Sequence, residues 1–115
     1  MNEEKKQAKH ELAGAEVVGV CDLVNVQDGA VVSRTLLKRG GGVVTVFAFD
    51  EGQALSEHTT TFDAIAQVLE GEAEIQVSGK SARVNAGEII LLPANQPHAV
   101  KASSRFKMLL TMIRP

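Results

Sequence analysis

The chain has 115 residues, of which 44% are hydrophobic and 23% charged, and its formal net charge of −2 is typical of one soluble globular domain, not of a disordered chain. Its 12 basic residues are scattered and it contains no Trp or Tyr, so we expect no nucleic-acid partner. No apolar run approaches the ~20 residues of a membrane span and the N-terminal segment is too polar for a signal peptide, so we expect a cytoplasmic protein with no membrane contact.

Residues 1–14 form a polar lead rich in Lys and Glu, which predicts a frayed helix or a disordered tail. Residues 15–115 contain no linker and no internal repeat, and we expect them to fold as a single domain. Cys21 is the only cysteine and cannot form an internal disulfide, so it is interpreted as a small core residue.

Short runs of apolar, often β-branched residues follow, bounded by Gly, Asp, Asn, Ser or Pro. This pattern is typical of strands separated by turns. The predicted strands, in chain order, are 31–37, 43–49, 55–59, 63–69, 73–77, 82–84, 88–92, 98–102 and 106–113. No long helical period interrupts them after residue 30, so the sequence predicts an all-β fold, an antiparallel sandwich or barrel.

The last predicted strand, 106–113, is largely apolar at both its odd and its even positions. Such a strand lies either in the centre of a sheet or under a partner subunit. Met108 and Met112 could line an adaptable pocket or simply fill the core, and the pattern leaves both open.

Two stretches have an informative spacing. Gly52 is followed after five residues by His58, with Gly71 thirteen positions later; Gly87 is followed after five residues by Pro93, with His98 five positions further on. This spacing resembles the two motifs of the cupin superfamily, G-x5-H-x-H-x3,4-E-x6-G and G-x5-P-x-G-x2-H-x3-N. The resemblance implies a small single-domain cupin, an antiparallel double-stranded β-helix or jelly-roll barrel.

In cupins that bind metal, the resemblance implies four ligands: two histidines of the first motif, its glutamate, and the histidine of the second. Here Thr60 replaces the second histidine and Ala64 the glutamate, which leaves His58 and His98. The fold that the resemblance implies could still make these two imidazoles face each other across the barrel. Zinc and iron sites ordinarily have at least three protein ligands, so we expect Zn, Fe, Mn, Ni or Cu to bind weakly at most. Asp63 could add a ligand only if a β-bulge after Thr61 redirected its side chain.

Without a metal, His58, Thr60 and His98 would be polar groups in a mostly apolar barrel, with Phe62 and Gln67 near them. A few convergent polar groups amid apolar walls are typical of a small-molecule pocket. Three functions stay open: binding of a small polar or carboxylated molecule with little or no metal, a divalent-metal-dependent enzyme of isomerase, decarboxylase or dioxygenase type, and an interaction or assembly module. Each histidine could also serve only to close the barrel through a hydrogen bond.

The resemblance further implies a homodimer, because small cupins commonly pair through sheet faces and N-terminal strand exchange. The apolar residues of 17–20, 43–49 and 106–113 exceed what one small barrel needs to fill its interior, which agrees with this expectation. A closed two-fold pair is also the commonest oligomer.

Overall fold

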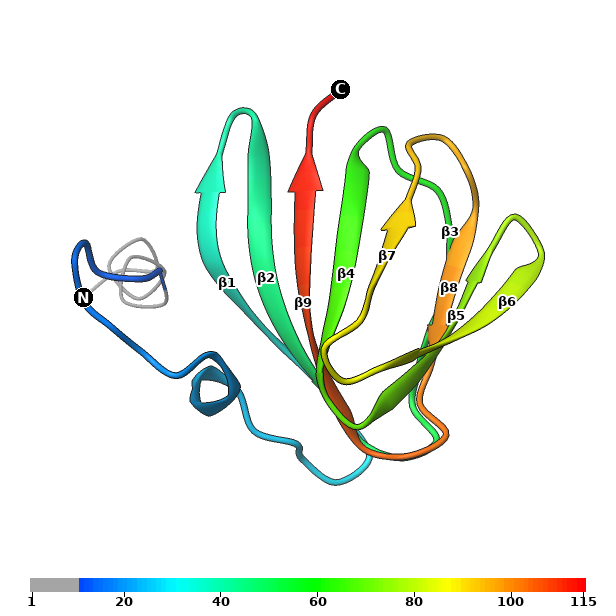
Figure 1. Ribbon diagram of the computed structural model, residues 1–115, viewed down its shortest axis with the longest axis horizontal. Coiled ribbons are helices and arrows are strands. Elements are labelled where there is room, and N and C mark those ends of the chain that lie inside the picture. Colours follow the sequence, from blue (N-terminus) through cyan, green and yellow to red (C-terminus); the bar gives the residue numbers. More distant parts are fainter. Residues whose placement is uncertain (1–10) are drawn as a thin grey trace.

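The computed structural model describes residues 11–115, which form nine strands in two antiparallel sheets (Figure 1). A short 3-10 helix, η1 (Val20–Leu23), precedes them. The strands are β1 (Val31–Arg39), β2 (Gly42–Phe49), β3 (Ala54–His58), β4 (Asp63–Glu70), β5 (Glu72–Val77), β6 (Lys80–Asn85), β7 (Ile89–Leu92), β8 (His98–Lys101) and β9 (Phe106–Ile113). All nine predicted strands are present with ends within two residues of the prediction, and the all-β jelly-roll prediction is confirmed.

The five-stranded sheet has the order β1-β2-β9-β4-β7 and the four-stranded sheet the order β3-β8-β5-β6. Within the described residues no helix has the length and apolar character needed to cross a membrane. The polar lead predicted over 1–14 lies mostly outside the described residues.

The main core lies between the two sheets. Side chains alternate between the faces of a strand, so Ala64, Ala66 and Val68 of β4 point inward and are buried, as are Phe106 and Met108 of β9. Phe49 and Phe106 are at most 1% exposed and their rings stack with centroids 4.4 Å apart. Met108 fills the same core, and Met112 packs against its edge.

A second apolar cluster covers part of the outer face of the five-stranded sheet. Val24 of the segment before β1 is buried there against Val46 and Ala48 of β2, with Leu109 of β9 packed beside them. The ammonium of Lys107 donates to the carbonyl of Cys21 at 2.7 Å and fixes the same segment. Strand β9 is central in its sheet, and the chain's own N-terminal segment covers its outer face at Lys107 and Leu109.

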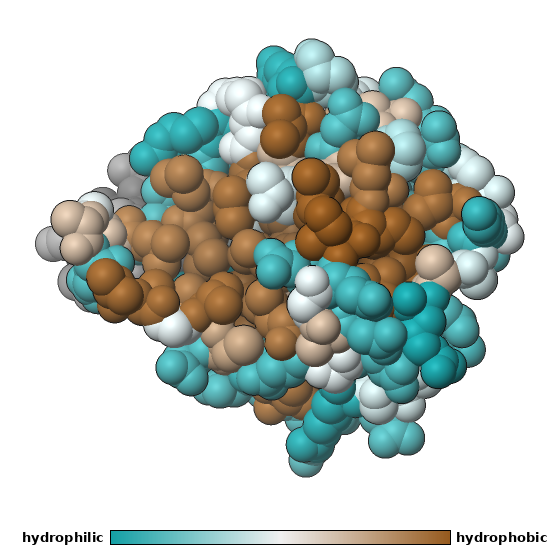
Figure 2. Space-filling view, viewed as in Figure 1, coloured by the Kyte–Doolittle hydropathy of each residue, from teal (hydrophilic) through white to brown (hydrophobic). Residues whose placement is uncertain are grey.

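The rest of this outer face is apolar and open. Ile65, Ile89 and Leu91 are 38%, 63% and 56% exposed, and Ile65 pairs directly with Leu91 across β4 and β7. Figure 2 shows the broad apolar region on this side of the molecule. The homodimer stays a prediction, which sedimentation equilibrium would test.

The motif glycines set the turns that hold the barrel together. Gly52, Gly71 and Gly87 have φ angles of 84°, 75° and 88°, in the left-handed region that favours glycine. At Gly71 a Cβ would also collide with the backbone oxygen of Arg105, so no larger residue fits there. These matches therefore specify shape, and the chemistry rests on other residues.

Candidate functional site

The two motif histidines lie side by side in the four-stranded sheet. His58 ends β3, His98 begins β8, and the two residues pair directly across these antiparallel strands. Their rings meet edge to face, with centroids 4.4 Å apart and planes 66° apart. The two histidines predicted to lie near each other are close together. The predicted placement on opposite sides of the barrel is wrong, because His58 and His98 are neighbours in one sheet.

A β-bulge turns His58 toward the interior. Leu55 pairs with Val100, and His58 pairs with His98, so the spacing is three residues in β3 and two in β8. In a regular strand, residues three apart point to opposite faces, and the extra residue of the bulge removes this difference. Leu55 and Val100 both pack on the main core, so His58 faces the same side as they do.

The hydrogen-bond partner of His58 determines which of its ring nitrogens carries the hydrogen. Its Nδ1 lies 2.8 Å from the backbone oxygen of Ser56. A carbonyl can only accept, so Nδ1 carries the hydrogen and donates it. In the neutral ring Nε2 then keeps its lone pair, and because His58 is exposed this nitrogen is accessible to a ligand.

His98 is buried, with only 7% of its surface exposed. Its Nδ1 is the one buried side-chain polar atom without a hydrogen-bond partner in residues 11–115. Burial, and next to it the positive charge that His58 can carry, lower the pKa of His98 below its ordinary value. The backbone of Gln96 acts in the opposite direction, yet no hydrogen bond of ordinary geometry reaches Nδ1. His98 is therefore neutral at pH 7, with a polar atom left unsatisfied.

Of the other predicted site residues, Thr60 and Phe62 lie at the same end of the barrel as His58 and His98, and Gln67 does not. Thr60 and Phe62 are in the connection that leaves His58, but the Thr60 hydroxyl is used locally: it donates to the Phe62 carbonyl at 3.1 Å and accepts from the Phe62 amide at 3.2 Å. Gln67 lies on the outer face of β4, because its neighbours Ala66 and Val68 face the core. The structure thus brings Thr60 and Phe62 to the site's end of the barrel and leaves Gln67 outside.

Comparison with known proteins agrees with this architecture. The family described as Cupin domain matches residues 45–114. The chain belongs to the cupin superfamily. A conserved protein of unknown function from Streptococcus pyogenes is 36% identical, with 90% of this chain and 91% of that chain covered and a TM-score of 0.85. A cupin 2 conserved barrel domain protein from Leptotrichia buccalis is 39% identical over 81% of this chain and 45% of its own, with a TM-score of 0.79.

One structure of lower sequence identity is described as that of an enzyme. The structure of a predicted oxalate decarboxylase from Thermotoga maritima is 17% identical, with 74% of this chain and 81% of that chain covered and a TM-score of 0.70. At this identity the likeness shows the fold alone. No curated protein matches the chain.

The residues of this cupin do not fit a resident metal centre. Ala64, at the glutamate position, is buried in the core. The Asp63 carboxylate accepts from the Ala94 amide at 2.8 Å, and β4 pairs regularly with β9 from Asp63 to Val68, so no bulge there redirects it. Residues 11–115 contain no cluster of three or more His, Cys, Asp or Glu side chains able to hold a metal. His58 and His98 supply two donors, one fewer than a catalytic zinc site ordinarily needs.

Proposed function

We propose that this cupin binds a small carboxylated molecule through His58 and His98, without a tightly held metal. The observation that carries the proposal is the unpartnered, buried Nδ1 of His98 beside the His58 ring. A buried polar atom without a partner costs about 1–3 kcal/mol, and its presence in a native structure calls for an explanation. A ligand that supplies the missing partner is that explanation.

The chemistry of the pair suits an acidic group. His98 is neutral at pH 7, and a carboxylate beside it would favour its protonated form, because an opposite charge nearby stabilises that form. Binding would therefore raise the pKa of His98 and draw in a proton.

Saturation-transfer-difference NMR with succinate and benzoate as probes tests the proposal. We expect transfer to at least one probe with the wild type and its loss in the double variant His58→Ala, His98→Ala. The matched control is His10→Ala, which removes the third histidine and is expected to bind as the wild type does. Equal transfer in the double variant and the wild type, or none to the wild type with either probe, would overturn the proposal.

A further inference from the structure

A hollow at one end of the five-stranded sheet has a charge opposite to that of the chain. Its volume is about 410 Å³, and it is lined by Lys38, Arg39, Gly40, Gly42, Val43, Phe62 and Arg114. Three of these residues are cations and none is acidic, although the chain as a whole carries a formal charge of −2. A cluster of like charges around a concave surface attracts ions of the opposite sign.

The strand register places this hollow on the interior side of the sheet. Lys38 pairs with Val43, Val43 with Met112, and Met112 with Ala64, in one row across four strands. Directly paired residues point to the same face, and Met112 and Ala64 belong to the main core. Lys38 is therefore directed inward, in the same row as the position where metal-binding cupins carry their glutamate.

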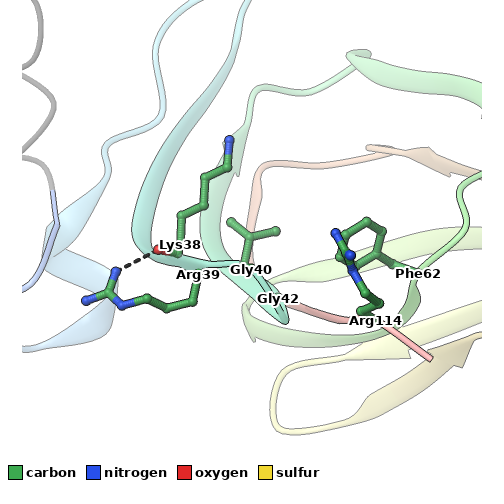
Figure 3. Close-up of a pocket in the computed structure, with 7 residues that line it drawn as sticks. Lys38, Arg39, Gly40, Gly42, Phe62 and Arg114 are labelled. Carbon is green, nitrogen blue, oxygen red and sulfur yellow. Dashed lines mark hydrogen bonds between the residues drawn. The ribbon is translucent and has the colours of Figure 1, made fainter.

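Arg114 approaches the hollow from the chain's C-terminal end. It follows the inward-facing Met112 by two residues, and its guanidinium carbon lies 5.8 Å from the centroid of the Phe62 ring. Figure 3 shows Arg114 alongside Phe62 on one side of the hollow and Lys38 on the other. No carboxylate of residues 11–115 lies within ion-pair distance of Lys38 or Arg114.

Arg39 differs from the other two cations. Its Nη1 donates to the Lys38 carbonyl at 2.6 Å and lies 3.4 Å from the Glu11 carboxylate. In Figure 3 its side chain runs away from Phe62 and Arg114. Arg39 thus lines the hollow with its stem while its charge is engaged elsewhere, which makes it a matched control.

The hollow and the histidine pair lie at the same end of the barrel. The β1–β2 turn, the end of β9 and the start of β4 meet there, and so do the end of β3 and the start of β8, which carry His58 and His98 (Figure 1). A ligand held by the histidines can therefore extend toward Lys38 and Arg114.

We propose that this hollow is an anion-binding subsite, in which Lys38 and Arg114 take a carboxylate or phosphate group and Phe62 packs against the attached carbon skeleton. Guanidinium and ammonium groups make short charge-assisted hydrogen bonds to both kinds of anion. The subsite stands on its own residues, and its link to His58 and His98 rests on the proposed function. Together they describe a ligand with a carboxylate at the histidine end and a second acidic group, a carboxylate or a phosphate, at the other.

Two-dimensional NMR titration of the full chain in a buffer free of phosphate tests the subsite. The probes are phenyl phosphate, benzoate and the neutral benzyl alcohol, so that the two acid types are separated from the ring alone. We expect at least one of the acids to bind, benzyl alcohol to bind far more weakly, and Lys38→Gln and Arg114→Gln each to raise Kd about fivefold to tenfold. Arg39→Gln is expected to raise Kd far less than either of them, because the Arg39 guanidinium is already held by the Lys38 carbonyl and the Glu11 carboxylate. Since all three residues are exposed, thermal unfolding should show each variant as stable as the wild type.

Two results would overturn the subsite: an equal loss of affinity in Arg39→Gln, which would indicate general surface attraction, or wild-type affinity in both Lys38→Gln and Arg114→Gln. The double variant His58→Ala, His98→Ala separates the two proposals. If it binds phenyl phosphate as the wild type does but loses the transfer to succinate, both proposals stand on separate residues. If it keeps both, the histidine proposal alone fails. If it loses phenyl phosphate binding while Lys38→Gln and Arg114→Gln keep the wild-type affinity, the subsite alone fails.

Discussion

Phe106→Ala is expected to lower the free energy of unfolding by about 3–5 kcal/mol, the range for removing a large aromatic side chain from a core. Phe106 is 1% exposed, stacks on Phe49 and lies where β9 begins, against the tight turn at Gly71. The truncated side chain would leave a cavity between the two sheets. Strand β9 cannot move inward to fill it without breaking its pairing with β2 and β4. Urea unfolding followed by circular dichroism measures the change.

The matched control is Leu91→Ala, at a position 56% exposed on the outer face, which should cost about 0.5 kcal/mol or less. A domain of this size is ordinarily stable by about 5–15 kcal/mol, so Phe106→Ala removes a large share of the total. A loss in Phe106→Ala no greater than that in Leu91→Ala would contradict the assignment of the stacked phenylalanines as the centre of the core.

His98→Leu is expected to keep the protein folded and to raise its free energy of unfolding at pH 7 by about 1 kcal/mol, while removing ligand binding. Leucine fills a similar volume and has no polar atom to leave unsatisfied, whereas His98 leaves Nδ1 buried without a partner. A gain in stability with a loss of binding is the result expected of a residue kept for function. Urea unfolding with the benzoate titration measures both quantities.

The effect of His98→Leu should grow as the pH falls. The pKa of His98 is lowered in the folded state, so below its ordinary value of 6.5 the unfolded chain binds a proton that the folded chain does not. The wild type therefore loses stability as the pH falls from about 6.5 toward the lowered pKa, and the leucine variant does not lose this contribution. His58→Leu is the control, because that ring is exposed and its Nδ1 is already satisfied by Ser56. An unchanged gap between wild type and His98→Leu from pH 7.5 to pH 5.5 would contradict the buried, neutral state of His98.

The strand boundaries were predictable because they depend on local features. Each strand has its own apolar alternation and ends at turn residues, and Gly52, Gly71 and Gly87 adopt backbone angles that glycine favours. The position of the segment around Val24 was not predictable, since its packing on β2 and β9 depends on the assembled sheet.

The candidate site was predictable only in part. The motif spacing found His58 and His98, but the bulge that turns His58 inward falls at Ser56 and Glu57, which carry no glycine or proline signal. Gln67 is an odd number of residues from Ala64, and strand parity alone places it on the opposite face. Lys38 and Arg114 are far apart in the sequence and meet at one hollow only through the β1-β2-β9 pairing, so no local pattern indicated them.

Metal stoichiometry tests the central claim most directly, namely that the histidine pair is an organic-ligand site and not a metal centre. Untagged protein would be incubated with Zn, Fe, Mn, Ni or Cu, desalted, and measured by inductively coupled plasma mass spectrometry beside the double variant His58→Ala, His98→Ala. We predict far less than one ion per chain, with no difference between the two proteins, because two imidazoles without a carboxylate hold these ions weakly. Close to one ion per chain in the wild type, absent from the double variant, would contradict the account and indicate a third ligand and a metal-dependent enzyme.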